Sequence, residues 1–237
     1  MKTGFLQVGH GEAVTLDRIP HMTFDDFRTD ALAIVNNGGT VVLYFAWPHG
    51  DTFKLMAVLR TDQLLVAGSD APDRYPSLTA ECEPFHMFER EIAEQYGILP
   101  EGHPWLKMVR YHANFRDRPD LFGNNYAEEI PGNYDYYSVA GEEIHEVAVG
   151  PVHAGVIEPG HFRFNCIGER VLNLEIQLGY QLRGVEKLLV NAAAKRLPIL
   201  AEGIAGDTAI GNALCMAQAF EALTGVSPDP GARIIRT

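Results

Sequence analysis

The stretch from residue 149 to residue 188 constrains the fold more than any other, because its hydrophobic period changes along its length. Apolar and polar residues alternate over 162–166 and again over 172–178, on either side of a Gly168-Glu169 turn. This pattern predicts a β-hairpin with one buried face. From Arg183 the apolar residues recur at helical spacing, which predicts that the hairpin leads into a helix. The side chains expected to be buried are Phe162, Phe164, Cys166, Leu172, Leu174, Ile176 and Leu178 in the hairpin and Val185, Leu188, Leu189 and Ala192 in the helix.

The N-terminal part of the sequence predicts an α/β layer. One helix is expected to begin after Thr23, a good N-cap residue, and to end at 37–39, where Asn is followed by two glycines. The apolar runs 41–47 and 52–60 flank a turn and predict a hairpin whose first strand is covered on both faces. A second helix, with apolar residues on one side and charged residues elsewhere, is expected to end at Gly97.

The rest of the chain adds a linker and further helical sequence. From residue 115 the chain is rich in Asn, Asp, Gly, Pro and Tyr without a sustained period, which predicts a linker at 126–142 between a domain at 1–125 and a second at 143–237. The fold class is therefore α+β, with an α/β layered domain followed by a β-hairpin and helices. Gly, Ser and Pro at 68–76 predict a loop.

Proline and glycine divide the C-terminal sequence as well. Pro198 is expected to break the chain, and a helix is expected from Asp207 or Thr208 to Gly225, with Pro228 and Pro230 ending it. The side chains expected to be buried on this helix are Ile210, Ala213, Leu214 and Ala217.

Composition excludes several classes of protein. The chain has 237 residues and 46% hydrophobic content, which is enough for a sizeable core. Its net charge of -12 argues against a nucleic-acid partner. No apolar run approaches the roughly 20 residues of a membrane-spanning helix, and no signal-peptide core is visible, so a cytoplasmic protein is expected. Cys82, Cys166 and Cys215 form no CxxC pair and are expected to be buried small side chains.

Two separate segments carry motifs that resemble one known family. GPVHAG at 150–155, EPGHFRF at 158–164 and LGYxxRGVEKL at 178–188 resemble the N-terminus of the large subunit shared by respiratory complex I and the membrane-bound nickel-iron hydrogenases of the formate hydrogenlyase type. FEREIAEQYGILPEGHPWL at 88–106 resembles the small hydrophilic C-type subunit of the same complexes. The two segments follow the order of the fused C-type and D-type subunits. The resemblance thus implies a C-type domain followed by the start of a large subunit.

The resemblance also indicates that the nickel ligands are missing. In the family the first cysteine pair lies in an RxCGxC motif, for which this chain has Gly203, Ala205 and Thr208 in place of the arginine and the two cysteines. Soft thiolates are the ligands that hold nickel. We therefore expect no metal site and a closer likeness to the complex I branch. Leu182 is a further departure, because relatives usually carry histidine there.

In the complex I branch a histidine of the first hairpin loop donates to a quinone oxygen, and His153 occupies the matching position. An imidazole is a suitable donor and proton source for a quinone that takes up protons. The resemblance implies that His153 is catalytic and that His161 and Asp207 help to bind the quinone. The alternative is a loop histidine that bonds to the backbone. No cofactor is expected in this chain; the quinone would bind in the complex, and an iron-sulfur cluster would lie in a partner subunit.

Charged residues matching those of the C-type subunit imply docking to neighbouring subunits. The residues expected to dock are Glu89, Arg90, Glu91, His103, Arg183 and Glu186. The alternative for the helical residues is a solvated charged face, and for His103 a capping or packing role. The implied partners are iron-sulfur and membrane subunits, which would hold the chain at the inner membrane without a span of its own.

Two functions remain open at this point. The first is a subunit or fragment of a complex I-like or formate-hydrogenlyase-like oxidoreductase, active only within the larger complex, that takes part in electron transfer toward quinone and in subunit assembly. The second is a non-catalytic scaffold or assembly protein that retains the fold.

The predicted linker leads to a first test. Because residues 126–142 lack a buried face of their own, limited proteolysis is expected to cut there first. Preferred cleavage within residues 23–60 would contradict this domain boundary.

Overall fold

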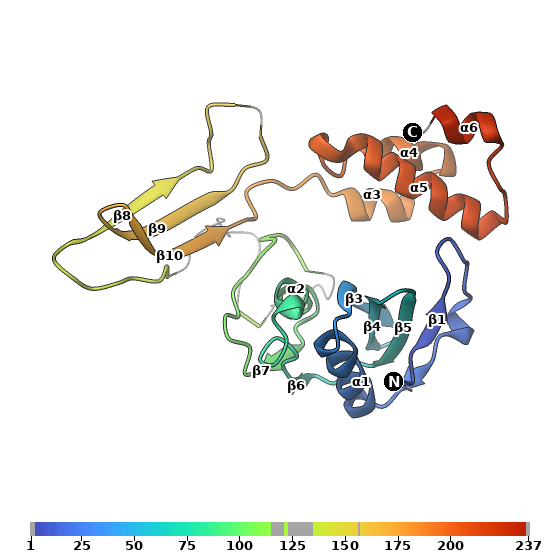
Figure 1. Ribbon diagram of the computed structural model, residues 1–237, viewed down its shortest axis with the longest axis horizontal. Helices are drawn as coiled ribbons and strands as arrows, with labels where there is room; N and C mark the ends of the chain where they lie inside the picture. The colour runs from blue at the N-terminus through green and yellow to red at the C-terminus, as the bar shows by residue number, and fades with distance from the viewer. Residues whose placement is uncertain (1–2, 115–120, 123–134, 156, 236–237) are drawn as a thin grey trace.

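The computed structural model describes residues 3–114, 121–122, 135–155 and 157–235. Figure 1 shows an N-terminal domain, a separate sheet and a group of helices along the chain. Most of the predicted linker, residues 126–134, lies outside the described residues, so the domain boundaries remain predictions. The mixture of helices and strands confirms the α+β class.

The N-terminal domain is built on a five-stranded sheet with the order β1-β5-β4-β3, in which β2 also pairs with β5. Neighbouring strands are antiparallel except for β2 and β5, and β6 pairs with β7 in a separate parallel ladder. The strands are β1 (Leu6–Val8), β2 (His21–Met22), β3 (Thr40–His49), β4 (Thr52–Arg60), β5 (Leu64–Asp70), β6 (Arg74–Pro76) and β7 (Leu99–Glu101). The helices are α1 (Phe24–Asn36) and α2 (His86–Tyr96), with short 3-10 turns η1 (Leu16–Arg18) and η2 (Glu83–Phe85).

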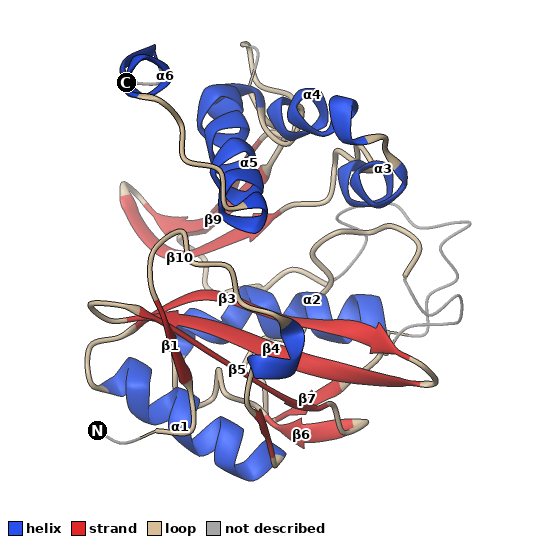
Figure 2. Ribbon diagram, turned by 90° about the vertical axis from the view of Figure 1, so that its right-hand side faces the viewer, coloured by secondary structure: helices blue, strands red, loops and turns tan. Residues whose placement is uncertain are grey.

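The main hydrophobic core lies between this sheet and the two helices (Figure 2). Thr23 caps α1 as predicted, because its hydroxyl accepts a hydrogen bond from the amide of Asp26. Gly97 ends α2 in the left-handed conformation, also as predicted. The largest buried side chains of the core include Phe27, Tyr44, Leu55, Leu59, Tyr75, Leu78, Phe85 and Ile92.

Helix α2 buries charged residues that the sequence placed on a solvated face. Glu89 is fully buried and accepts hydrogen bonds from the amides of Leu78 and Thr79 and from the hydroxyls of Ser77 and Thr79, at 2.5–3.0 Å. Arg90 is also buried and donates to backbone carbonyls further along the chain. The alternative of a solvated charged face is therefore wrong for these two residues and for Glu94, which is also fully buried. Sequence spacing shows which residues share a face of the helix but not which loops fold back over it.

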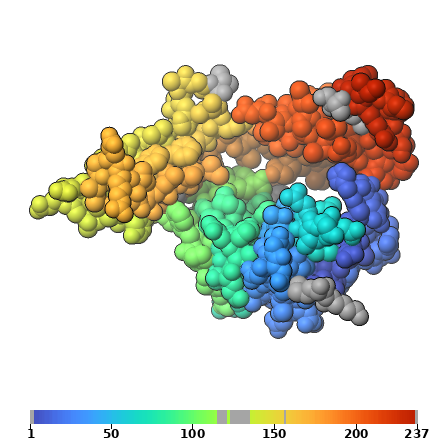
Figure 3. All heavy atoms as spheres, in the orientation of Figure 1, coloured from blue at the N-terminus to red at the C-terminus, as the bar shows by residue number. Residues whose placement is uncertain are grey.

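The C-terminal half consists of a three-stranded sheet and a group of helices, and the sheet projects from the rest of the molecule (Figures 1 and 3). The predicted hairpin is present, and a third strand joins it in the order β10-β9-β8. The strands are β8 (Ile144–Val149), β9 (His161–Ile167) and β10 (Arg170–Gln177). The helices are α3 (Val185–Asn191), α4 (Leu197–Glu202), α5 (Ala209–Thr224) and α6 (Pro230–Ile235), with 3-10 turns η3 (Ala194–Arg196) and η4 (Gly206–Thr208).

Strand β10 of the hairpin buries the face opposite to the one predicted, whereas Cys166 of β9 is buried as predicted. Leu174 and Ile176 of β10 are 41% and 44% exposed, whereas Glu175 and Gln177 between them are 0% and 1% exposed. Alternation shows that the two faces differ in polarity, but it does not show which face another segment covers. The apolar side chains exposed on this sheet, which we call the apolar sheet face, include Val147, Val149, Leu174 and Ile176, with Phe162 and Phe164 half-buried between them.

The C-terminal helices are also less buried than expected. No residue of α3 or α5 is buried, and Ile210 of the predicted buried stripe is 84% exposed. Cys215 is exposed, which contradicts the prediction of three buried cysteines, although Cys82 and Cys166 are buried. These helices contact mainly one another, so each leaves an apolar side open.

Three local predictions also need correction. The predicted loop at 68–76 is mostly strand, because β5 continues to Asp70 and β6 begins at Arg74. Strand β3 is fully covered on one face only, since Val42 and Leu43 are exposed. Pro198 and Pro230 stand in the first turns of α4 and α6 rather than breaking the chain. Proline is tolerated there because a backbone N–H in the first turn has no acceptor within the helix.

The burial of Glu89 leads to a test of stability. Glu89→Ala leaves four buried donors without an acceptor, so we expect the free energy of unfolding to fall by roughly 3–5 kcal/mol. Urea unfolding of the purified chain measures this change. Glu143→Ala, at an exposed position, is the control and is expected to change it by less than about 0.5 kcal/mol. Equal effects of the two variants would contradict the structural role of Glu89.

Candidate functional site

The candidate site begins with a second buried carboxylate of α2. Both oxygens of Glu94 are used, because they accept hydrogen bonds from the amides of Val109, Arg110 and Tyr111 at 2.6–3.2 Å. Three consecutive amides around one carboxylate form an anion-binding nest. Within it Tyr111 has a φ of 54°, which is uncommon for a residue other than glycine. Glu94 therefore holds this turn of the N-terminal domain in one conformation.

The turn at 109–111 contacts the second half of the chain at Gly179. A Cβ atom at Gly179 would lie 2.6 Å from Cδ2 of Tyr111 and 3.0 Å from the carbonyl oxygen of Val109. Gly179 also has a φ of 97°, a conformation that favours glycine. The LGY part of the large-subunit motif thus packs directly against a turn that is fixed by the C-type motif.

A buried ion pair joins the two halves nearby. Nζ of Lys107 lies 2.9 Å from Oε1 of Glu175 on β10 and 2.6 Å from the carbonyl oxygen of Asp135. The second carboxylate oxygen of Glu175 accepts from the amide of Tyr137 at 2.8 Å. A buried carboxylate is costly unless it is paired and hydrogen-bonded, and Glu175 is both. This pairing explains why the polar face of the hairpin is the buried one.

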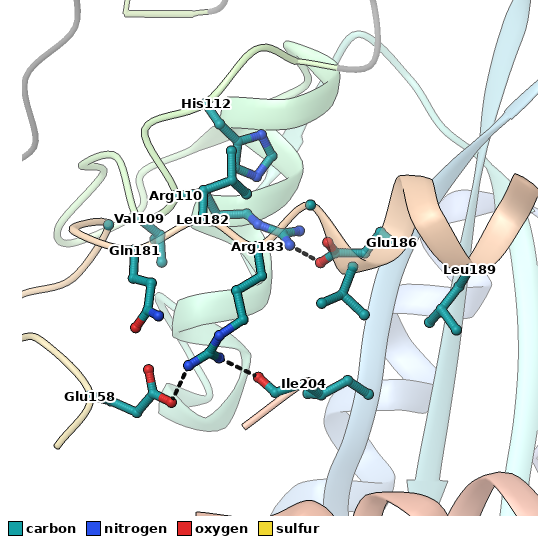
Figure 4. A pocket seen from close by; sticks show the side chains of 13 residues that line it. Val109, Arg110, His112, Glu158, Gln181, Leu182, Arg183, Glu186, Leu189 and Ile204 are labelled. Atoms are coloured by element: carbon teal, nitrogen blue, oxygen red, sulfur yellow. Dashed lines mark hydrogen bonds and ion pairs between the residues drawn. The ribbon is translucent and has the colours of Figure 1, made fainter. Parts of the chain in front are cut away.

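Beside the contact of Gly179 with the turn at 109–111 lies a cleft of about 370 Å³, which we call the junction cleft (Figure 4). Arg110 from the N-terminal domain forms ion pairs with Glu91 and with Glu186 at the start of α3. Arg183 donates to Glu158 at 2.7 Å and to the carbonyl oxygen of Ile204 at 3.0 Å. The hydrogen bond from Arg183 holds the pKa of Glu158 below its usual range. Apolar residues of the cleft wall are Val109, Leu182, Val185, Leu189 and Ile204.

His153 and His161 lie at the neck of the loop between β8 and β9, which contributes Glu158 to the wall of this cleft. Nε2 of His153 lies 3.0 Å from the carbonyl oxygen of Gly160, and Nδ1 of His161 lies 3.0 Å from that of Gly150. Since a carbonyl oxygen only accepts, each of these nitrogens carries a proton. A Cβ at Gly150 would lie 2.0 Å from the oxygen of Gly160, so the neck closes only with glycine there. The two histidines therefore join the two ends of the loop.

The loop is connected to the segment that carries Asp207 through Glu158. Glu158 binds Arg183, whose other contact is Ile204, and it also accepts a hydrogen bond from the backbone of Gly206. Asp207 itself is exposed within η4. The structure thus brings the loop of His153 and His161 to the segment before α5, while the role of the three residues in quinone binding remains a prediction.

The residues expected to dock partners lie in three different environments. Glu89 and Arg90 are buried in the N-terminal domain, whereas Glu91, Arg183 and Glu186 make the ion pairs of the junction cleft. His103 stacks on His86 with the ring centroids 5.3 Å apart, and its Nδ1 accepts from the amide of Trp105 at 3.0 Å. A docking role for these residues remains a prediction.

Sequence reasoning missed three charged residues on which the junction depends. Glu94 has the spacing of a charged helix face, and Arg110 and Glu158 lie at the borders of the motifs. The available signal was that Glu94 and Glu158 lie within the motifs and that Arg110 follows one of them closely. Among the described residues, no group of three His, Cys, Asp or Glu side chains lies close enough to hold a metal ion.

Comparison with known proteins agrees with this arrangement. Residues 26–121 match the family of the respiratory-chain NADH dehydrogenase 30 kDa subunit. Hydrogenase-4 component G of Escherichia coli K12 is 26% identical over 184 residues, which are 71% of this chain and 32% of that protein. Formate hydrogenlyase subunit 5 of the same organism is 26% identical over 178 residues, 68% of this chain and 30% of its own length. The C/D subunit of the NADH-quinone oxidoreductase of Bacteroides thetaiotaomicron is 25% identical over 186 residues, 68% of this chain and 35% of its own.

An N-terminal 30 kDa-type domain that packs on a hairpin and helices with the large-subunit motifs defines the class of fused C-type and D-type subunits. Residues 26–121 therefore belong to the 30 kDa subunit family, and the chain is similar over about two thirds of its length to complex I and hydrogenase subunits, as its motifs indicated. It spans about a third of the length of these relatives. Within the described residues, the helices are too short or too polar to cross a membrane.

The histidines near the junction predict a dependence of stability on pH. Burial lowers the pKa of His86, His103 and His112 below the usual value. Because the folded state then binds fewer protons than the unfolded state, the stability is complete above about pH 6.5 and declines as the pH falls toward the lowered values. We expect the urea midpoint to be lower at pH 5.5 than at pH 7.5, and His103→Gln to reduce that difference. An equal midpoint at both pH values would contradict this expectation.

Proposed function

We propose that this chain acts as a subunit, or part of a subunit, of a complex I-like or hydrogenase-like oxidoreductase, where it takes part in electron transfer toward a quinone and in subunit assembly. The proposal rests on the likeness of the chain to complex I and hydrogenase subunits and on one observation in particular. The loop that carries His153 is fixed at its neck by two histidine-carbonyl bonds and held near η4 through Glu158 and Arg183. A reacting group must be held in place before it can assist a reaction.

The bond to Gly160 determines what His153 can do. Its Nε2 proton is donated to the carbonyl oxygen, so Nδ1 is the nitrogen available to a substrate. Reduction of a quinone to a hydroquinone requires two electrons and two protons. The protonated imidazole would donate its Nδ1 proton to one quinone oxygen, while the electrons would come from an iron-sulfur cluster in a partner subunit. His161 would offer Nε2 in the same way, and the exposed carboxylate of Asp207 would accept a hydrogen bond from the hydroquinone.

The apolar sheet face supports a role in assembly. Large exposed apolar patches are typical of protein interaction sites, and one side of this three-stranded sheet consists of such side chains. The proposed partners are iron-sulfur and membrane subunits of the same complex. They would place this chain on the cytoplasmic side, peripheral to the inner membrane.

A non-catalytic scaffold is the alternative, and the burial of three glutamates favours it. Glu89, Glu94 and Glu175 are fully buried, and their hydrogen bonds to distant segments hold the chain together. Such a protein would keep the assembled complex intact without contributing a reacting group. The two functions differ in what they require of His153.

Replacing His153 by Ala in the assembled complex distinguishes them. Loss of a proton donor is expected to lower quinone-linked turnover by roughly 100-fold, while the free energy of unfolding of this chain changes by no more than about 1 kcal/mol. His145→Ala is the matched control, because His145 is an exposed histidine of the same sheet. Unchanged turnover with an intact complex would reject catalysis and leave the scaffold.

A further inference from the structure

A second cavity lies beside the Lys107–Glu175 ion pair, and Lys107 is one of its lining residues. Its volume is about 760 Å³, within the range of roughly 300–1,000 Å³ that is usual for ligand-binding clefts. The loop around Trp105, the start of α2, the segment 135–137 and the polar face of β10 enclose it. We call it the Trp105 cavity. None of its lining residues belongs to the proposed quinone site.

Aromatic side chains form much of its wall. Trp105, Tyr136, Tyr137 and His86 line it, and the rings of His86 and Trp105 lie 6.3 Å apart. Two cations of the chain already lie near the Trp105 ring, with Nζ of Lys107 at 5.3 Å and Cζ of Arg90 at 6.0 Å from its centroid. Cations are attracted to the faces of aromatic rings, and most strongly to tryptophan. The wall therefore suits a group that is both positively charged and able to pack against rings.

Two carboxylates give the mouth of the cavity a negative charge. Glu83 and Asp135 both line it and are exposed. Within the described residues neither side chain forms an ion pair, whereas Lys107, the cation among the lining residues, is paired with Glu175. The chain as a whole carries a net charge of -12. A cationic partner is thus favoured both at the cavity and at long range.

His86 and His103 add no positive charge that would neutralise the carboxylates at the mouth of the cavity. Burial is the main cause that lowers the pKa of His86 and of His103. Both rings are therefore neutral near pH 7, and His86 presents an uncharged aromatic surface to the cavity.

We propose that the Trp105 cavity is a docking site for an extended protein segment bearing an arginine or lysine, whose cation lies between the Trp105 and Tyr137 rings and the carboxylates of Glu83 and Asp135. Arginine fits best, because its planar guanidinium stacks on aromatic rings and also binds carboxylates through paired donors. The volume of the cavity accommodates neighbouring residues of the segment as well. This site is independent of the proposed reaction with quinone, so either can fail without the other.

Fluorescence of Trp105 tests the proposal directly. The chain contains two tryptophans, so Trp47→Phe leaves Trp105 as the single emitter. We expect the emission to change saturably when the peptide acetyl-Gly-Arg-Gly-amide is added, with a millimolar Kd that rises with sodium chloride concentration. The matched peptide acetyl-Gly-Gln-Gly-amide is expected to produce no saturable change.

Variants then assign the binding to this cavity. Glu83→Gln combined with Asp135→Asn is expected to weaken binding of the arginine peptide at least fivefold. Glu142→Gln combined with Glu143→Gln removes the same charge from exposed positions outside the cavity and is expected to leave the Kd within twofold. No saturable response to the arginine peptide, equal responses to both peptides, or equal weakening by the two double variants would overturn the proposal.

Discussion

The rest of the structure depends on two carboxylates of α2 that bind backbone amides. Glu89 holds the segment 77–79 on one side of the helix, and Glu94 holds the turn 109–111 on the other. Burying an ionised carboxylate is strongly unfavourable unless hydrogen bonds replace its hydration. Here the amides of otherwise irregular segments supply those bonds, so the carboxylates and the segments stabilise each other. Helix α2 thereby fixes two loops that its apolar face alone would not position.

The second half of the chain packs on the turn 109–111, which Glu94 fixes, and on the residues next to it. Tyr111 packs on Gly179, Arg110 reaches Glu186, and Lys107 pairs with Glu175. These three contacts connect the segment after the C-type motif with the segment around the large-subunit motif. Together they place the hairpin, its loop and the start of α3 against the N-terminal domain. The geometry proposed for His153 is therefore supported by residues far from it in the sequence.

The two halves differ in how they use hydrophobic side chains. In the N-terminal domain they form a closed core between the sheet and two helices. In the C-terminal half the apolar sheet face and much of the helical surface remain exposed. Hydrophobic burial is the main favourable term in folding and in association. The first pattern is that of a domain stable by itself, and the second fits the proposed role within a larger assembly.

The sequence by itself determined the α+β class, the hairpin and its turn, the caps of α1 and α2, and the likeness to complex I and hydrogenase subunits, because periodicity, capping residues and motifs are local properties. The tertiary structure decided which faces are covered. Leu174 and Glu175 alternate in the sequence whichever of them is buried, and only the pairing of Lys107 with Glu175 buries the polar one. In the same way, Glu89 and Glu94 have the spacing of a solvated helix face. The partners of Glu89 are loop amides and hydroxyls 10–12 residues away, and those of Glu94 are loop amides 15–17 residues away. No local pattern specifies where such loops return.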